Sequence, residues 1–161
     1  MSKRMAIAAL SLVGLFVALY LTLYKLGVIG ELRCAVGSCE AVNTSPWATL
    51  LGYPVAAWGL GFYLTALALS LAGVQERWAD SIGVSVGLVA MSAWGVLFSG
   101  WLTYLELFVI DAICIWCVIS AIIVTVMFAV SVADLREFQS TDAGPDALTR
   151  ESLGRESLAN D

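Results

Sequence analysis

Two cysteine pairs are the residues of this chain whose type and spacing could do chemistry. Cys114 and Cys117 lie in DAICIWCVIS, an otherwise apolar run, and Cys34 and Cys39 lie in ELRCAVGSCEAV. A Cys-x-x-Cys motif alone fits a redox pair, half of a zinc site, or two small apolar side chains. The elements that carry the four cysteines must therefore decide between these interpretations.

The composition indicates an integral membrane protein. Of 161 residues, 60% are hydrophobic, 13% are charged and none is histidine, and a membrane-spanning helix needs about 20 apolar residues. Four spans satisfy this, at about 5–28, 54–74, 81–105 and 112–133. The apolar run before residue 75 is too long for one helix and contains Pro46 and Pro54, so we place its helix from Pro54 onwards. We expect an all-α bundle of four transmembrane helices, with a cysteine loop and lid segment at 29–53.

The basic residues predict the orientation. Cytoplasmic flanks of membrane helices carry the excess of Lys and Arg, and six basic residues fall on one side of the four spans and two on the other. The six are Lys3, Arg4, Arg77, Arg136, Arg150 and Arg155; the two are Lys25 and Arg33. Both termini are therefore expected in the cytoplasm of a multi-pass plasma-membrane protein. The first span lacks a small-residue cleavage pattern, so we expect it to be an uncleaved helix. Residues 134–161 predict an acidic, largely disordered cytoplasmic tail.

This orientation places all four cysteines on the extracytoplasmic face, where disulfides persist. Gly37 and Ser38 permit a turn that brings Cys34 and Cys39 within bonding range. We expect Asp111 to cap the last helix and Cys114 to lie in its first turn, where the helix dipole favours a thiolate. Zinc would also accept four cysteines, but the missing histidine and the depth of Cys117 favour a redox role.

The cysteine segments resemble the vitamin K epoxide reductase family in its bacterial or archaeal form. The resemblance rests on CAVGSCEAVNTSPWATLLGYPVAAWG and YLELFVIDAICIWCVISA, and it extends from about residue 3 to residue 133. It implies a four-helix bundle around a quinone of the menaquinone, ubiquinone or vitamin K type. It also implies a separate DsbA-like thioredoxin-fold partner, since we find no fused domain behind the bundle. We expect membrane lipid and the quinone pool as further partners, and no nucleic acid.

The resemblance assigns a role to each cysteine. Cys34 would meet the partner, Cys39 would pass electrons inward, Cys114 would accept them and Cys117 would face the quinone. A reduced partner would attack the Cys34–Cys39 disulfide, the freed Cys39 would attack Cys114, and the Cys114–Cys117 pair would reduce the quinone. The chain is thus predicted to be a quinone-dependent thiol oxidoreductase that supports disulfide formation.

Further residues are candidates for the quinone pocket. Asn43 and Ser45 belong to the family's loop motif, with turn and helix-cap chemistry as the alternative, and Trp58, Phe62 and Trp116 are aromatic candidates. The lid would present Trp47, Leu50, Leu51 and Tyr53 to lipid or to the pocket mouth. Ala121 stands where the vertebrate enzymes have a tyrosine, which favours plain quinone reduction over epoxide reduction. The competing hypothesis is a scaffold or transporter subunit whose disulfides are only structural.

Overall fold

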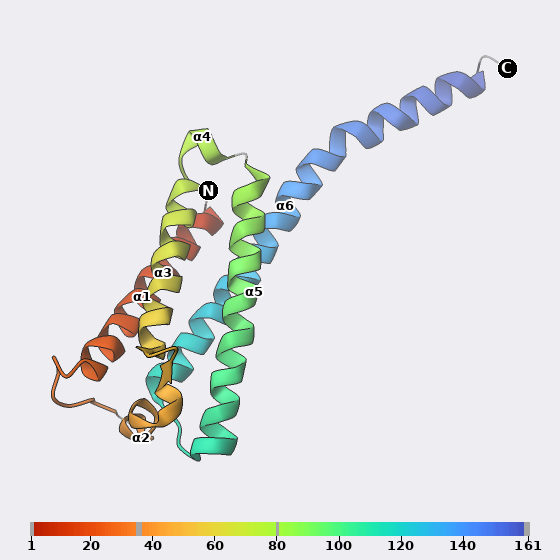
Figure 1. Ribbon diagram of the computed structural model, residues 1–161. Coiled ribbons are helices and arrows are strands. Elements are labelled where there is room, and N and C mark those ends of the chain that lie inside the picture. The colour runs from red at the N-terminus through yellow and green to blue at the C-terminus, as the bar shows by residue number, and fades with distance from the viewer. Residues whose placement is uncertain (1, 35–36, 80, 160–161) are drawn as a thin grey trace.

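The fold is a bundle of four long helices, which we describe from a computed structural model. It describes residues 2–34, 37–79 and 81–159, so residues 35, 36, 160 and 161 of the predicted loop and tail lie outside the described residues. The long helices are α1 (Ser2–Lys25), α3 (Val55–Ala72), α5 (Ile82–Leu105) and α6 (Ile115–Ala159). They run alternately up and down, so the α1–α3 connection and the start of α6 lie at the same end of the bundle (Figure 1).

The short elements lie at the two ends. α2 (Cys39–Thr44), the 3-10 turn η1 (Pro46–Ala48) and a two-stranded hairpin of β1 (Thr49–Leu50) and β2 (Tyr53–Pro54) form the predicted lid. α4 (Glu76–Ala79) joins α3 to α5 at the opposite end. α5 continues without a break into the π-helical turn η2 (Glu106–Ile110).

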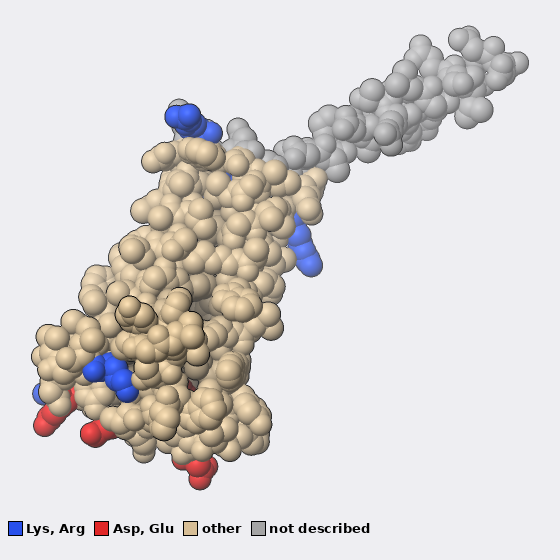
Figure 2. Space-filling view, viewed as in Figure 1, with Lys and Arg blue, Asp and Glu red and all other residues tan. Residues whose placement is uncertain are grey.

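The membrane character of the bundle is confirmed. Within the described residues, four helical stretches are long and apolar enough to cross a membrane: Lys3–Lys25, Val55–Ala72, Ile82–Ile110 and Ile115–Glu137. Each agrees with a predicted span to within five residues at either end, and the largest difference is the third span, which ends at Ile110 instead of residue 105. Figure 2 shows charged side chains gathered toward the two ends of the bundle, with an uncharged belt between them on this face. This distribution suits a bundle surrounded by lipid.

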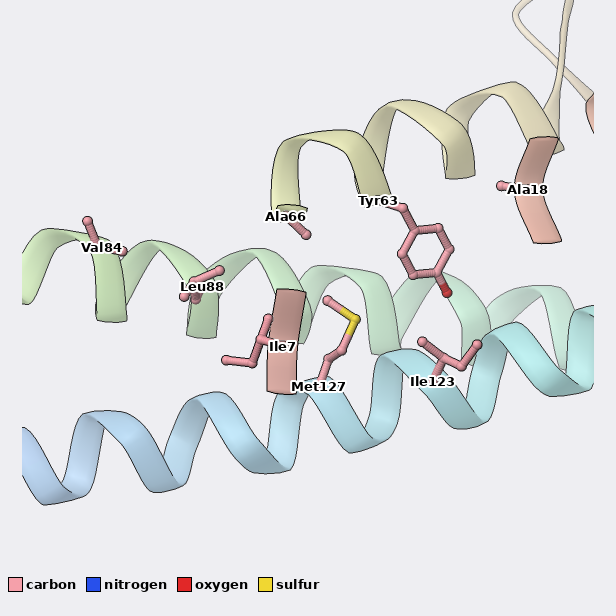
Figure 3. Packing of buried hydrophobic residues seen from close by; sticks show 8 residues of the cluster. All are labelled: Ile7, Ala18, Tyr63, Ala66, Val84, Leu88, Ile123 and Met127. Atoms are coloured by element: carbon pink, nitrogen blue, oxygen red, sulfur yellow. The ribbon is translucent and has the colours of Figure 1, made fainter. Parts of the chain in front are cut away.

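The bundle core is small and tightly packed. Ile7, Tyr63, Leu88 and Met127 are almost fully buried and bring all four long helices together (Figure 3). Gly14 makes room for the ring of Tyr63, because a Cβ at position 14 would lie 2.2 Å from a ring carbon. The Tyr63 hydroxyl in turn reaches the Ser120 hydroxyl at 2.8 Å.

Two features depart from the expected organisation. The segment that we expected to be a largely disordered tail continues α6 as helix to Ala159 and projects beyond the bundle (Figure 1); it contains many good helix formers. In addition, Arg4 is buried at the end of the bundle that carries the N-terminus. Its guanidinium contacts the Asp134 carboxylate at 3.2 Å, the Gly73 carbonyl at 2.7 Å and the Ser85 hydroxyl at 3.0 Å, which ties the four long helices together at this end.

Candidate redox site

The cysteine loop closes over the start of α6. Cys34 and Cys39 form a disulfide, as the turn at Gly37 and Ser38 predicts. Gly37 pairs with Cys114 in an isolated antiparallel β-bridge, and the Ser38 N–H donates to the Ile113 carbonyl at 3.0 Å. The cysteine loop and the Cys-x-x-Cys motif therefore form one site, although they lie about 75 residues apart in the sequence.

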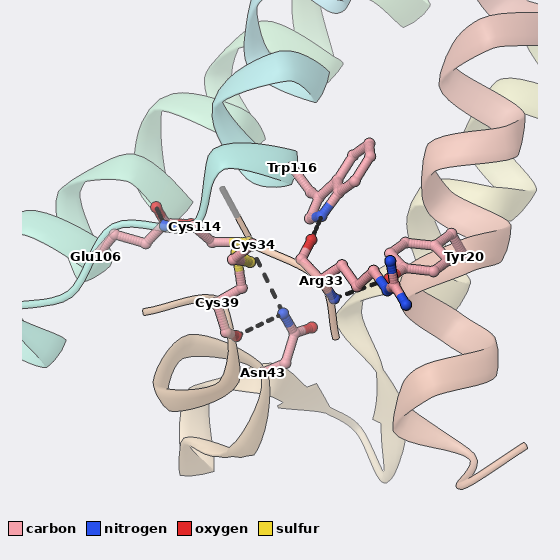
Figure 4. The surroundings of a disulfide bond; sticks show 8 residues. All are labelled: Tyr20, Arg33, Cys34, Cys39, Asn43, Glu106, Cys114 and Trp116. Atoms are coloured by element: carbon pink, nitrogen blue, oxygen red, sulfur yellow. Dashed lines mark hydrogen bonds between the residues drawn. A yellow bond between two sulfur atoms is a disulfide. The ribbon is translucent and has the colours of Figure 1, made fainter. Parts of the chain in front are cut away.

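Arg33, the residue before Cys34, is held by the side chains of Trp116 and Tyr20. The Trp116 indole N–H donates to the Arg33 carbonyl at 3.1 Å, and the Arg33 N–H donates to the Tyr20 hydroxyl at 3.1 Å (Figure 4). The rings of Tyr20 and Trp116 pack with centroids 5.2 Å apart. The structure thus uses Trp116, a predicted pocket residue, to position the cysteine loop.

Cys39 and Cys114 are buried together. Cys39 is 1% exposed and Cys114 is 0% exposed, and both belong to one apolar cluster with Val42. Asn43 bridges this cluster, since its side-chain amide nitrogen lies 3.0 Å from the Cys39 carbonyl and 3.9 Å from the Cys114 sulfur. Asn43 was predicted as a pocket residue; the structure places it between the two cysteine pairs as well as at the cavity wall.

Cys114 is the N-cap of α6. Its carbonyl accepts the Val118 N–H at 3.1 Å, which makes it the residue that opens the helix. The prediction that Asp111 caps this helix is wrong: Asp111 ends η2 in the left-handed conformation, with φ of 53°. The N-cap of α6 is Cys114 and not Asp111 because α5 extends through η2 to Ile110, which leaves only residues 111–114 to reverse the chain.

The N-cap position makes Cys114 a reactive thiol. A hydrogen bond from the Cys117 thiol lowers the pKa of Cys114 to about 7, and the N–H groups of Cys117 and Trp116 act in the same direction. Burial and the nearby Glu106 carboxylate oppose this lowering. The lowered pKa favours the Cys114 thiolate, which is the form that attacks disulfides.

Cys117 lies one helical turn further on and lines an apolar cavity. This cavity of about 380 Å³ is bounded by α1, the lid, α3, α5 and the start of α6. Of the predicted pocket residues, Asn43, Ser45, Trp58 and Phe62 line it, and so do Trp47, Leu50 and Leu51 of the lid. The Ser45 hydroxyl donates to the Val42 carbonyl at 2.7 Å, and the Trp58 indole donates to the Leu50 carbonyl at 3.3 Å. Both side chains thus also hold the lid.

Glu106 is the site residue that the sequence analysis missed. Only 5% exposed, it lines the cavity and accepts the Cys114 N–H at 3.2 Å. Cys117 lines the same cavity as Glu106. Glu106 follows the predicted third span, so its place in the sequence indicates only a polar residue at a helix end, whereas η2 prolongs that helix and the Glu106 side chain is buried.

The comparison with known protein families agrees with this geometry. The model of the vitamin K epoxide reductase family matches residues 5–132, which include the four long helices up to Val132, the cysteine loop and the Cys-x-x-Cys motif. Since this match covers well over half of the chain, the protein belongs to the vitamin K epoxide reductase family.

Proposed function

We propose that the protein carries electrons from a thioredoxin-fold dithiol through its two cysteine pairs to a membrane quinone, and so supports disulfide formation. Family membership indicates a membrane thiol oxidoreductase. The observation that carries the finer proposal is the position of Cys114: it is buried with Cys39 on one side and adjoins Cys117, which lines an apolar cavity, on the other. A purely structural disulfide requires no such second pair.

The outer exchange begins at Cys34. This residue is more exposed than Cys39, which is 1% exposed, so a partner's thiolate reaches Cys34 first. Attack on Cys34 breaks the loop disulfide and releases Cys39 as a thiolate. The partner's second thiol then attacks the mixed disulfide, so the partner leaves oxidised and the loop pair holds two electrons.

The inner exchange passes these electrons to the α6 pair. The Cys39 thiolate attacks Cys114 of an oxidised Cys114–Cys117 pair, and Cys117 leaves as a thiolate. Cys34 then attacks Cys39, which restores the loop disulfide and releases Cys114. The products, a Cys34–Cys39 disulfide and two free thiols at Cys114 and Cys117, are the pairing that the structure shows.

The cavity fits a quinone ring. Its volume of about 380 Å³ lies in the range of small-molecule sites, its wall is mainly aliphatic and aromatic, and Cys117 reaches it. A quinone bound there supplies a two-electron, two-proton acceptor. Trp58 and Phe62 would flank the ring, while Cys114 and Cys117 would form a disulfide as their two electrons leave.

The proposal places the cysteine sites outside the plasma membrane and both termini in the cytoplasm. The basic residues counted in the sequence support this side, and an oxidising compartment suits the loop disulfide. A separate DsbA-like protein is the proposed partner.

One experiment tests the function. The purified protein in detergent is mixed with a reduced thioredoxin-fold dithiol protein, with and without ubiquinone-1 or menadione, and both dithiol oxidation and quinone absorbance are followed. We expect oxidation of one dithiol for each quinone reduced, and none without quinone. Silence in the presence of both quinones, with all four cysteines intact, would leave the scaffold hypothesis standing instead.

A further inference from the structure

Glu106 is a buried acid at the point where the thiols meet the cavity. Its carboxylate accepts the Cys114 N–H at 3.2 Å, and the residue lines the same cavity as Cys117. A carboxyl group that is 5% exposed is costly to bury without a use or a full set of partners. Here its hydrogen-bond donor is the backbone N–H of one reacting cysteine, and the other reacting cysteine lines the same cavity.

The local backbone fixes Glu106 in this position. The η2 turn begins at Glu106, and the Glu106 carbonyl accepts the Ala112 N–H at 3.0 Å, which folds residues 106–112 back upon themselves. π-Helical turns inside α-helices are frequent at functional sites. The extra residue in this turn brings the Glu106 side chain under the N-terminus of α6 instead of leaving it at the lipid-facing edge.

Few other groups could exchange a proton with Cys117. Among the described residues that line the cavity, the titratable side chains are Lys25, Tyr63, Glu106 and Cys117 itself. The Lys25 ammonium is bonded to the Asn43 carbonyl at 2.6 Å, and the Tyr63 hydroxyl is bonded to Ser120. Among these side chains, Glu106 is thus the carboxylate that can act as a base at the cavity wall that Cys117 also lines.

We infer that Glu106 is a catalytic proton carrier, which takes the proton of the Cys117 thiol and passes it into the cavity as the α6 thiols are oxidised. This role rests on the proposed quinone reductase function. Oxidation of the two thiols to a disulfide releases two electrons and two protons, and reduction of a quinone consumes both. Among the described side chains that line the cavity, Glu106 is the one that can take up the Cys117 proton.

The step balances as follows. The Cys117 S–H proton moves to the Glu106 carboxylate, the Cys114 thiolate bonds to the Cys117 sulfur, and the electron pair leaves to the quinone as the named acceptor. Glu106 then releases its proton on the cavity side, and a second proton arrives from water. A positioned general base of this kind contributes about 10² to 10⁴-fold to a rate.

Glu106→Gln is the first test. Glutamine keeps an oxygen that accepts the Cys114 N–H but cannot take up a proton, so the loop and α6 should keep their geometry. Fully reduced, desalted protein is mixed with excess ubiquinone-1 or menadione, and the first turnover is followed by quinone absorbance. We expect the rate to fall on the order of 10²-fold. Asp111→Asn, at an exposed acid of the same connection, is the matched control and should reduce quinone at the wild-type rate.

Two further measurements separate proton transfer from positioning. Thiol exchange between Cys39 and Cys114, followed in a Cys117→Ser background, should proceed equally with Glu or Gln at 106. Added acetate should restore part of the quinone reduction rate in Glu106→Ala, since it returns a carboxylate to the vacated space.

The outcomes are distinct. A Glu106→Gln rate within threefold of wild type would overturn the proton-carrier role, as would a slow rate accompanied by slow Cys39–Cys114 exchange and no rescue by acetate. If the wild-type protein itself reduces neither quinone, the proposed quinone reductase function is wrong, and the proton-carrier role of Glu106 is overturned with it.

Discussion

Gly37 pairs with Cys114 across an antiparallel β-bridge, so the backbone of the cysteine loop is bonded directly to the residue that opens α6. This contact depends on glycine. Gly37 has a φ of +90°, and a Cβ at this position would lie 2.2 Å from the Ile113 carbonyl oxygen. Loop docking, and with it the approach of Cys39 to Cys114, therefore requires the absence of a side chain at position 37.

Gly37→Ala is expected to separate the two cysteine pairs. The clash with Ile113 should displace the loop, slowing Cys39–Cys114 exchange at least tenfold and exposing Cys114 to alkylation, while each pair remains chemically intact. Gly52→Ala is the matched control, because Gly52 also has a positive φ, +83°, but its added Cβ would meet no described heavy atom within 4 Å. Equal slowing in both variants would show that backbone strain, and not the contact with Ile113, is responsible.

The architecture was largely predictable from the sequence. Uncharged runs of sufficient length determine where helices can cross a membrane, and Pro54 marked the start of α3 at Val55. The ends of the helices were less predictable. The continuation of α5 into η2 and the start of α6 at Ile115 depend on how residues 106–114 pack against the loop, which residue types alone do not specify.

The chemistry of the site was only partly predictable. Cysteine spacing identified the two pairs, because only cysteine performs disulfide exchange. Glu106, in contrast, looked like an ordinary polar residue at a helix end, and its role depends on a π-helical turn. Trp116 was predicted at the pocket for its aromatic ring, yet it holds the loop through its N–H, a contact with Arg33 across 83 residues of sequence.

Cys117→Ala is expected to stop electron transfer at a Cys39–Cys114 disulfide. Without Cys117, the Cys114 thiolate attacks the loop disulfide, a Cys39–Cys114 bond forms, Cys34 is released, and turnover with quinone stops. Cys34→Ala should instead block oxidation of a protein partner while a small membrane-permeant reductant still drives quinone reduction through Cys114 and Cys117. Non-reducing peptide mapping checks both variants. A dominant Cys34–Cys39 pair with Cys114 free in Cys117→Ala would mean that electrons do not pass between the two cysteine pairs through Cys39 and Cys114.

The pH dependence of the rate at which the Cys39–Cys114 disulfide forms reports the Cys114 pKa. Because that pKa is lowered to about 7, thiolate is present above pH 7 and is lost as the pH falls below it. In Cys117→Ser, whose hydroxyl can still donate to Cys114, this rate should rise with pH to a plateau with a midpoint near 7. In Cys117→Ala the largest cause of the lowering is removed, so the midpoint should move upward. Identical midpoints would argue against the hydrogen bond from residue 117.

The buried Arg4–Asp134 ion pair should contribute more to stability than the exposed Lys3–Glu137 pair beside it. Asp134→Ala leaves the 5% exposed Arg4 without its carboxylate, and removing one partner of a buried pair costs about 3 kcal/mol or more. Glu137→Ala removes the exposed partner of Lys3 and should cost less than about 1 kcal/mol. Thermal unfolding in detergent compares the two variants. Equal shifts in Tm would indicate that Arg4 is satisfied without Asp134.

The sidedness of the bundle can be tested at two loop positions. Gly30 and Gln75 are both exposed and lie at opposite ends of the helices, in the α1–α2 connection and between α3 and α4. In a chain whose four cysteines are replaced by serine, a single cysteine is introduced at either position, and intact cells are treated with a membrane-impermeant thiol reagent. The distribution of Lys and Arg predicts labelling of Gly30→Cys, and labelling of Gln75→Cys only after the cells are opened. The reverse pattern would place Cys34, Cys39 and Cys114 at the reducing face of the membrane, where the loop disulfide would not persist and the proposed direction of electron flow could not operate.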